Sequence, residues 1–155
     1  MNLRNIKLVD ALAKLGGTIA NAMDADPEFT PCNRPAAIVM DNVTALALKI
    51  SEDELSARIQ QVLDLAEHVE EHHGAAPAPA VDGTLLSTTQ MALIENMIDL
   101  AGVAYPALKK GNTDPEVNAY FYRGLASLAH SDAAATEWTE KYIATKAIAQ
   151  KLFAA

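Results

Sequence analysis

SEDELSARIQQVLDLAEHVEEHHG, residues 51–74, carries the signals for one complete helix, from its start to its end. Ser51 and Glu54 have the spacing of a capping box, in which each side chain bonds to the backbone of the other residue at a helix start. Gly74 is typical of a helix end. The apolar residues between them recur at intervals of four and three: Leu55, Ile59, Val62, Ala66 and Val69. This spacing predicts a helix that ends at about His73, with one apolar side for a neighbouring helix to cover.

Two more helices are predicted before this stretch. The first should run from about Leu3 to Met23, because leucine and isoleucine recur there at helical spacing. Gly16 and Gly17 interrupt its pattern, which indicates either a kink or the close approach of another helix. Residues 24–35 contain three prolines and should form a loop. Residues 36–50 then have the broad apolar face of a second helix.

Three helices are predicted after residue 84. Ser87 and Gln90 form a second capping box and should open a helix that Pro106 ends or kinks. Asp114 is a suitable cap for the next helix, whose first turn can hold Pro115. A last helix contains Trp138 and the residues that follow it. The expected fold is therefore all-α, a helical bundle of about six helices.

The composition supports this fold and suggests how it is divided. Half of the 155 residues are hydrophobic and only 5% are aromatic, a mixture that favours closely packed helices over strands. Residues 74–83, GAAPAPAVDG, have the composition of a linker. We therefore expect two three-helix lobes, residues 1–73 and 84–155, joined by this Ala/Pro/Gly linker.

The charge and the single cysteine exclude several kinds of site. The net charge is −8, and residues 1–73 carry 6 Lys and Arg against 12 Asp and Glu. Direct binding of nucleic acid is not expected, because it needs a cationic face. The single cysteine, Cys32, rules out an internal disulfide and a cysteine-based zinc site, and its loop position favours a buried or inert thiol.

The sequence also predicts where the protein resides. Charged residues interrupt the apolar residues near the N-terminus, unlike in a secretory signal. No run approaches the roughly 20 apolar residues needed to cross a bilayer. We expect a protein of the cytoplasm or another intracellular site, or a component of a viral particle, without contact to membranes.

EHVEEHH, residues 67–73, is the segment that most resembles a metal site. His68, Glu71 and His72 match the H-x-x-E-H pattern of inverted zinc peptidases, in which both histidines bind zinc and the glutamate activates a water. At 100° per residue, however, His68 lies about 140° and His72 about 100° from the apolar side of the helix. We expect both to lie at a solvated helix end, and a surface metal site or a peptidase centre remains the alternative.

Aromatic residues are concentrated near the C-terminus. Of eight aromatic residues, only Phe29 precedes residue 105. Tyrosine and tryptophan often anchor protein interfaces. Adjacent residues on a helix point in different directions, so the consecutive aromatics 120–122 cannot all enter one core. The candidate partner-binding residues are Tyr120, Tyr122, Trp138 and Tyr142.

These features favour a non-enzymatic protein-interaction module, an adaptor or an assembly or structural subunit of a larger, for example viral, complex. Its partner would be another protein or further copies of the chain. No catalytic residue and no cofactor are assigned. One alternative is a zinc-dependent hydrolase or metal-responsive regulator that uses His68 and His72. Another is a small acidic inhibitor or regulatory protein that mimics a polyanion.

Overall fold

The computed structural model describes residues 6–74, 86–128, 134 and 136–141. It confirms the predicted fold class, because the protein is an all-α bundle of about six helices, and the described residues contain no strand. Residues 136–141 are helical. The five helices with defined bounds are α1 (Ile6–Ala25), α2 (Asn33–Ala45), α3 (Glu52–His73), α4 (Thr88–Lys109) and α5 (Pro115–Ser127).

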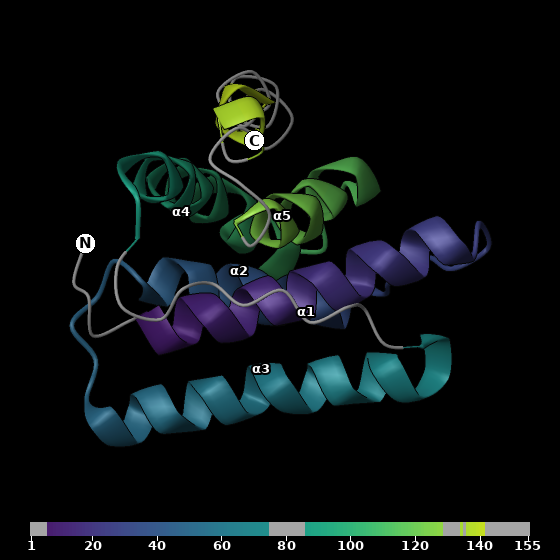
Figure 1. The fold of residues 1–155 in the computed structure, drawn as a ribbon, viewed down its shortest axis with the longest axis horizontal. Helices are drawn as coiled ribbons and strands as arrows, with labels where there is room; N and C mark the ends of the chain where they lie inside the picture. Colours follow the sequence, from purple (N-terminus) through teal and green to yellow (C-terminus); the bar gives the residue numbers. More distant parts are fainter. Residues whose placement is uncertain (1–5, 75–85, 129–133, 135, 142–155) are drawn as a thin grey trace.

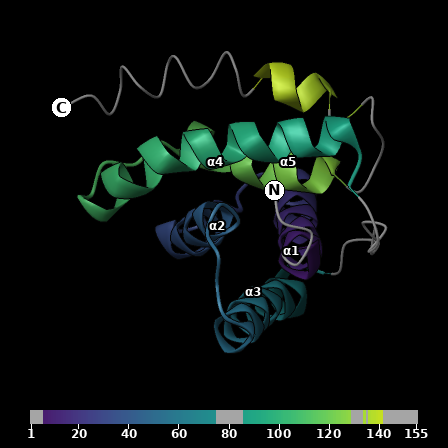
Figure 2. The same ribbon diagram turned by 90° about the vertical axis from the view of Figure 1, so that its left-hand side faces the viewer.

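The helices are arranged in three layers (Figure 1). The pair α1 and α2 forms the middle layer, with α3 on one side and α4 and α5 on the other. Figure 2 looks along α1, α2 and α3 and shows α4 and α5 crossing over them, with residues 136–141 on the outer side of that layer. Helix α1 packs mainly against α5 and α3, while α2 packs mainly against α4. The middle layer is therefore covered from both sides.

The starts of α3, α4 and α5 lie where the sequence predicts them, because local capping groups define them. Helix α2 instead begins at Asn33, inside the segment 24–35 that is predicted to be a loop. The Ser51 hydroxyl accepts a bond from the Glu54 backbone N–H at 3.2 Å. Ser87 and Gln90 form the complete reciprocal capping box, with distances of 3.1 and 2.8 Å. The Asp114 carboxylate caps α5 through the N–H of Glu116 at 2.9 Å. Each contact satisfies a backbone donor that the helix itself leaves unpaired.

Gly16 is where α1 and α5 come closest. A Cβ atom at this position would lie 2.6 Å from Leu125 Cβ and 2.7 Å from the Tyr122 carbonyl oxygen. A Cβ at Gly17 would meet nothing within 4 Å. Of the two explanations that the sequence leaves open, close approach of another helix is therefore correct for Gly16.

One predicted helix end is wrong, and at Pro106 one of two alternatives is excluded, because the helix does not end there. Helix α2 ends at Ala45, not at residue 50. The residues that follow donate to carbonyls three positions back instead of four, as in the bond from the Leu48 N–H to the Ala45 carbonyl at 3.0 Å. This turn leaves the Leu48 side chain 59% exposed. Helix α4 continues past Pro106 to Lys109. Packing extends beyond the proline, since Ala107 is buried, and this compensates for the missing backbone donor.

Helices from both predicted lobes contribute to one hydrophobic core cluster, which includes Leu12 and Val39 from the first lobe and Leu100 and Phe121 from the second. The division into residues 1–73 and 84–155 remains a prediction. Residues 75–83 of the predicted linker lie outside the described part of the chain.

Helix α4 differs from the expectation that no stretch of the sequence is long and apolar enough to cross a membrane. Among the described residues it is the one helix long and apolar enough to cross a membrane, judged by length and composition alone. In the bundle, α4 packs against α2 and buries Leu93, Met97 and Leu100. The core helix of a bundle meets the same criterion without entering a membrane.

A buried amide connects α2 to α3. Asn42 is fully buried and donates to the Ile38 carbonyl at 2.8 Å and to Gln61 Oε1 at 3.3 Å. Its own oxygen accepts from Arg58 at 3.2 Å, and Arg58 also pairs with Asp41 at 3.1 Å. These bonds satisfy a polar group that would otherwise be costly to bury, and they keep α3 aligned on the middle layer.

Candidate functional site

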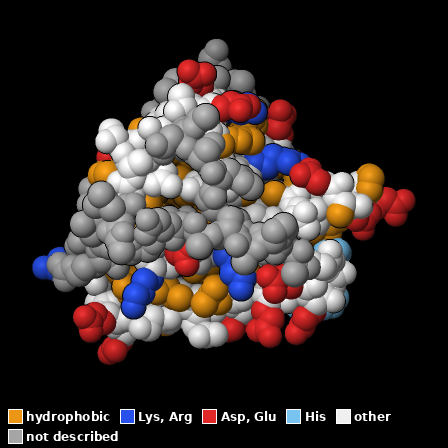
Figure 3. Space-filling model, viewed as in Figure 1, with side chains coloured by type: hydrophobic (Ala, Val, Ile, Leu, Met, Phe, Trp, Pro, Cys, Tyr) orange, Lys and Arg blue, Asp and Glu red, His pale blue; other side chains and the backbone are white. Residues whose placement is uncertain are grey.

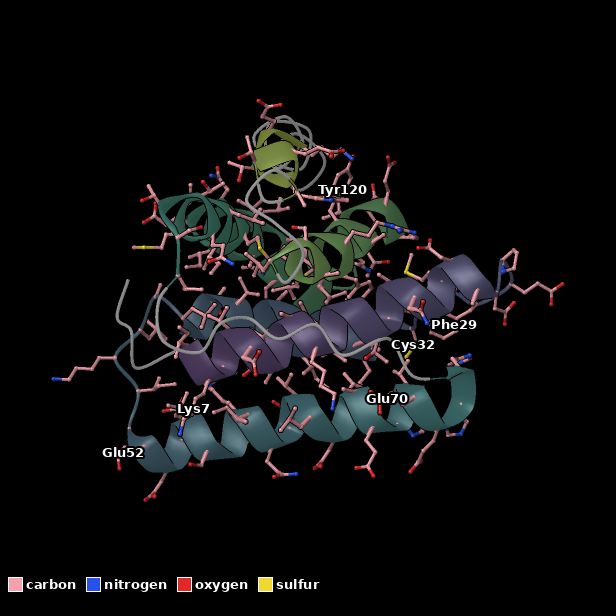
Figure 4. The ribbon with its side chains drawn as sticks, viewed as in Figure 1. Lys7, Phe29, Cys32, Glu52, Glu70 and Tyr120 are labelled. Carbon is pink, nitrogen blue, oxygen red and sulfur yellow. The ribbon has the colours of Figure 1, made fainter. Side chains whose placement is uncertain are left out.

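The three consecutive aromatic residues of α5 take up different environments. Phe121 is 0% exposed and Tyr122 is 1% exposed. Both can be buried because α5 is covered by α1 on one side and also contacts α2 and α4. Tyr120 is only partly buried and lies on the side of α5 that faces residues 136–141 (Figure 4). The prediction that the three cannot share one core is therefore confirmed, with Tyr120 as the residue outside it.

Tyr122 is not a surface residue, and its assignment to a partner-binding surface is wrong. Its backbone carbonyl lies at the close approach to Gly16 of α1, and its side chain is buried in the core. Its hydroxyl is buried and has no hydrogen-bond partner among the described residues. Burial, and secondarily the nearby thiol of Cys32, raise the pKa of Tyr122. The neutral phenol is therefore favoured in the folded state.

Because Tyr122 is buried, the free energy of unfolding should depend on pH in the alkaline range. A tyrosine of the unfolded chain titrates at about pH 10, whereas folded Tyr122 keeps its proton to higher pH. Below pH 10 both states keep the proton and Tyr122 has no effect on the pH dependence. Above it, the unfolded state loses the proton first, so the free energy of unfolding falls. Urea unfolding between pH 8 and about 11 should show a steeper loss for the wild type than for Tyr122→Phe, and parallel curves would contradict this.

The aromatic surface consists of Tyr120, Trp138 and the residues around the pocket between them. The two rings meet edge to face, with centroids 5.5 Å apart and an interplanar angle of 74°. Both side chains are partly buried against the core, which limits their motion. The pocket has a volume of about 230 Å³, and its other lining residues are Glu116, Ala119, Arg123 and Lys141.

Charged groups surround these two rings. The Lys141 ammonium lies 4.4 Å from the centre of the Trp138 ring and pairs with Glu137 at 3.1 Å. Arg123 pairs with Asp24 at 3.0 Å, which ties this edge of α5 to the end of α1. The aromatic surface therefore has an apolar centre and a rim that carries both signs of charge. Tyr142, the remaining predicted partner-binding residue, lies outside the described residues.

A second and larger pocket lies between the turn after α2 and helix α4. Its volume is about 590 Å³, and it is lined by Leu46 to Lys49 together with Glu95, Ile98 and Asp99. Exposed Leu48 stands at its edge. Sequence reasoning missed this pocket because it placed residues 46–50 in a continuous helix, which would have packed these side chains along the α2 face.

The two predicted metal ligands lie at the exposed end of α3, as their angle from its apolar side indicates. His68, Glu71 and His72 are all exposed, and each offers a ligand atom within 4.8 Å of the others. Among the described residues this is the one such group of three or more potential ligands. Figure 3 shows the histidines together at one edge of the molecule, close to acidic side chains.

The loop between α1 and α2 comes near this end of α3 (Figure 4). The rings of Phe29 and His73 are tilted against each other with centroids 4.0 Å apart. Cys32 occupies the N-cap position of α2 and is exposed. Of the predicted buried or inert thiol, the buried alternative is therefore wrong, and the inert thiol stays a prediction. The thiol is exposed because the loop passes over the surface and turns it outward at the start of the helix.

No protein-family model matches the sequence, and searches of curated proteins and of solved structures found no significant match. Two features of the molecule bear on its function: the aromatic surface on α5 and the cluster of His68, Glu71 and His72 at the end of α3.

Proposed function

We propose that the protein is a non-enzymatic interaction module, an adaptor or assembly subunit, that associates with copies of itself through the aromatic surface. The observation that carries this proposal is the Tyr120–Trp138 pair, two large rings held edge to face beside a pocket. The membership of a particular larger complex, viral or cellular, remains a prediction.

The composition of this surface resembles the centre of a protein interface. Tryptophan, tyrosine and arginine are the residues that most often dominate binding energy, and Trp138, Tyr120 and Arg123 lie together here. The two rings pack against the core, so little conformational freedom would be lost on binding. A rim of charged residues around an apolar centre is the usual anatomy of such a site.

The mixed charge of the rim favours a second copy as the partner. Glu116 and Glu137 contribute negative charge, while Arg123 and Lys141 contribute positive charge. In a two-fold dimer the same patch faces itself, and a patch with both signs can place opposite charges across the axis. A stable interface covers about 800 Å² on each partner, so the contact would extend from the pocket along the exposed side of α5.

Native mass spectrometry of the wild type and of Tyr120→Asp tests this proposal. The wild type should form a closed oligomer, and the variant should be monomeric at the same concentration with unchanged helix content in circular dichroism. Loss of an interface centre costs about 2 kcal/mol or more, so the dissociation constant should rise at least about 30-fold.

The matched control is Leu48→Asp, which places the same charge beside the other pocket. It should leave the oligomer intact. A monomeric wild type would refute self-association. If Leu48→Asp disrupts the oligomer and Tyr120→Asp does not, the interface lies at the pocket beside Leu48 and not at the aromatic surface.

The two alternative functions suggested by the sequence, a metal-dependent protein and a small acidic inhibitor, differ in their support. A zinc-dependent hydrolase needs a ligand from a second element and a substrate cleft beside the metal. His68, Glu71 and His72 all come from α3, which supports metal binding more than hydrolysis. That the protein is a small acidic inhibitor remains a prediction. In that case its binding to the target protein should weaken steeply as the salt concentration rises.

A further inference from the structure

We propose that His68, Glu71 and His72 form a surface site for one divalent transition-metal ion, such as zinc or nickel. The three residues occupy positions i, i+3 and i+4 of α3, which places them on one side of a single helical turn. Their ligand atoms lie within 4.8 Å of one another, and all three side chains are exposed. The site is separate from the aromatic surface, which lies on α5 and residues 136–141.

The distances allow a metal ion after small side-chain movements. Zinc binds histidine nitrogen and carboxylate oxygen at about 2.0–2.2 Å, so neighbouring ligands of a tetrahedral ion lie roughly 3.3 Å apart. The present separations of up to 4.8 Å must therefore close by about 1.5 Å at most. Exposed side chains can do this by rotating about their own bonds, while the α3 backbone stays in place.

One ring nitrogen of His72 is held by the backbone of its own helix. Its Nδ1 lies 2.8 Å from the carbonyl oxygen of His68. A carbonyl oxygen can only accept, so the bond requires the proton on Nδ1 and leaves the lone pair of a neutral ring on Nε2. Metal-binding histidines usually donate their other N–H to a carbonyl or carboxylate in this way, which fixes the tautomer and aims the free nitrogen.

The second histidine ring is close to the first. The centroids of His68 and His72 are 4.4 Å apart with an interplanar angle of 47°. Two imidazoles this close can share one ion. Nearby Glu67 and Glu70 add negative charge to the same end of α3, which raises the local concentration of cations.

The donor set indicates which ions should bind. Imidazole nitrogen suits zinc, nickel and copper, whereas magnesium and calcium prefer sites made of oxygen ligands. With two nitrogens and one carboxylate the site favours the first group. Because all three residues are exposed, water would complete the coordination.

Metal binding should stabilise the last helical turn of α3. An ion held by residues 68, 71 and 72 would connect both ends of the last helical turn before Gly74, the residue that caps α3 with a φ of 87°. Helix ends open more readily than helix centres. Metal binding should therefore slow the opening of this turn, beside the contact between Phe29 and His73.

Isothermal titration calorimetry of the full chain with zinc, nickel and magnesium chloride tests the site. We expect one zinc or nickel ion per chain and no measurable magnesium binding. His68→Ala and His72→Ala should each weaken zinc binding at least about tenfold, and Glu71→Gln should weaken it less. The matched control is His73→Gln, which removes the adjacent histidine outside the cluster and should leave zinc affinity unchanged. Circular dichroism of each variant verifies that the helices are intact.

Unchanged zinc affinity in both alanine variants would overturn the proposal, as would one zinc ion per two chains or an equal loss in His73→Gln. Hydrogen exchange gives a second readout: zinc should protect residues 70–74 in the wild type and not in His72→Ala. Repeating the titration with Tyr120→Asp separates this proposal from the proposed function. Zinc binding should persist in that variant whether or not self-association through the aromatic surface is correct.

Discussion

Gly16→Ala should lower the free energy of unfolding by about 3 kcal/mol, the upper part of the range for overpacking a well-packed core. The added methyl group would lie 2.6 Å from Leu125 Cβ and 2.7 Å from the Tyr122 carbonyl oxygen. One of these atoms belongs to the backbone, so rotating a side chain cannot relieve the overlap. The helices α1 and α5 would have to separate, and the bundle would lose packing at its most extensive helix contact. Urea unfolding measures the change as a lower midpoint.

Gly17→Ala is the matched control, since it makes the same chemical change one residue along the same helix. Its Cβ would meet nothing within 4 Å. Alanine is the better helix former by up to about 1 kcal/mol, so this variant should be more stable than the wild type. The two neighbouring substitutions should therefore differ in sign. Equal effects would show that α5 does not approach α1 at Gly16.

Tyr122→Ala should destabilise the protein by about 3–5 kcal/mol, as truncation of a large buried aromatic side chain does. The side chain is 1% exposed, and the structure around a truncated core residue relaxes only partly into the space that it leaves. Thermal or urea unfolding should show this loss in dilute solution, where association plays no part. A variant as stable as the wild type would contradict the burial of this side chain in the core.

Tyr122→Phe is the control that separates the ring from its hydroxyl. The hydroxyl is buried and unpaired among the described residues, so its removal relieves the cost of an unsatisfied polar group. We expect this variant to be more stable than the wild type by about 1 kcal/mol. A loss of similar size would mean that the hydroxyl has a bonding partner after all.

The two proposed sites use different parts of the molecule. The aromatic surface depends on α5 and residues 136–141, which share one side of the bundle. The metal ligands lie at the end of α3, in the layer on the opposite side of α1 and α2. Zinc binding and association should therefore respond independently to substitutions, unless the partner itself reaches across the end of the bundle.

Part of the candidate sites follows from the sequence. The exposure of His68 and His72 follows from their angle to the apolar side of one helix, which depends only on residues of that helix. The concentration of aromatic residues near the C-terminus likewise draws attention to Tyr120 and Trp138. Their approach to 5.5 Å could not be predicted, because it joins two segments whose relative position depends on packing. The pocket beside Leu48 gives no signal in the sequence.

The sequence by itself determined the helices and most of their starts. Ser51, Ser87 and Asp114 satisfy backbone groups within three residues, so no other part of the chain is needed to place these boundaries. Only the tertiary structure decided how the helix faces are used. Gly16 is essential because α5 passes over it, and Tyr122 is buried while neighbouring Tyr120 is not, because α1 covers one side of α5 and leaves another open. Such contacts join residues more than 100 positions apart, and local spacing carries no information about them.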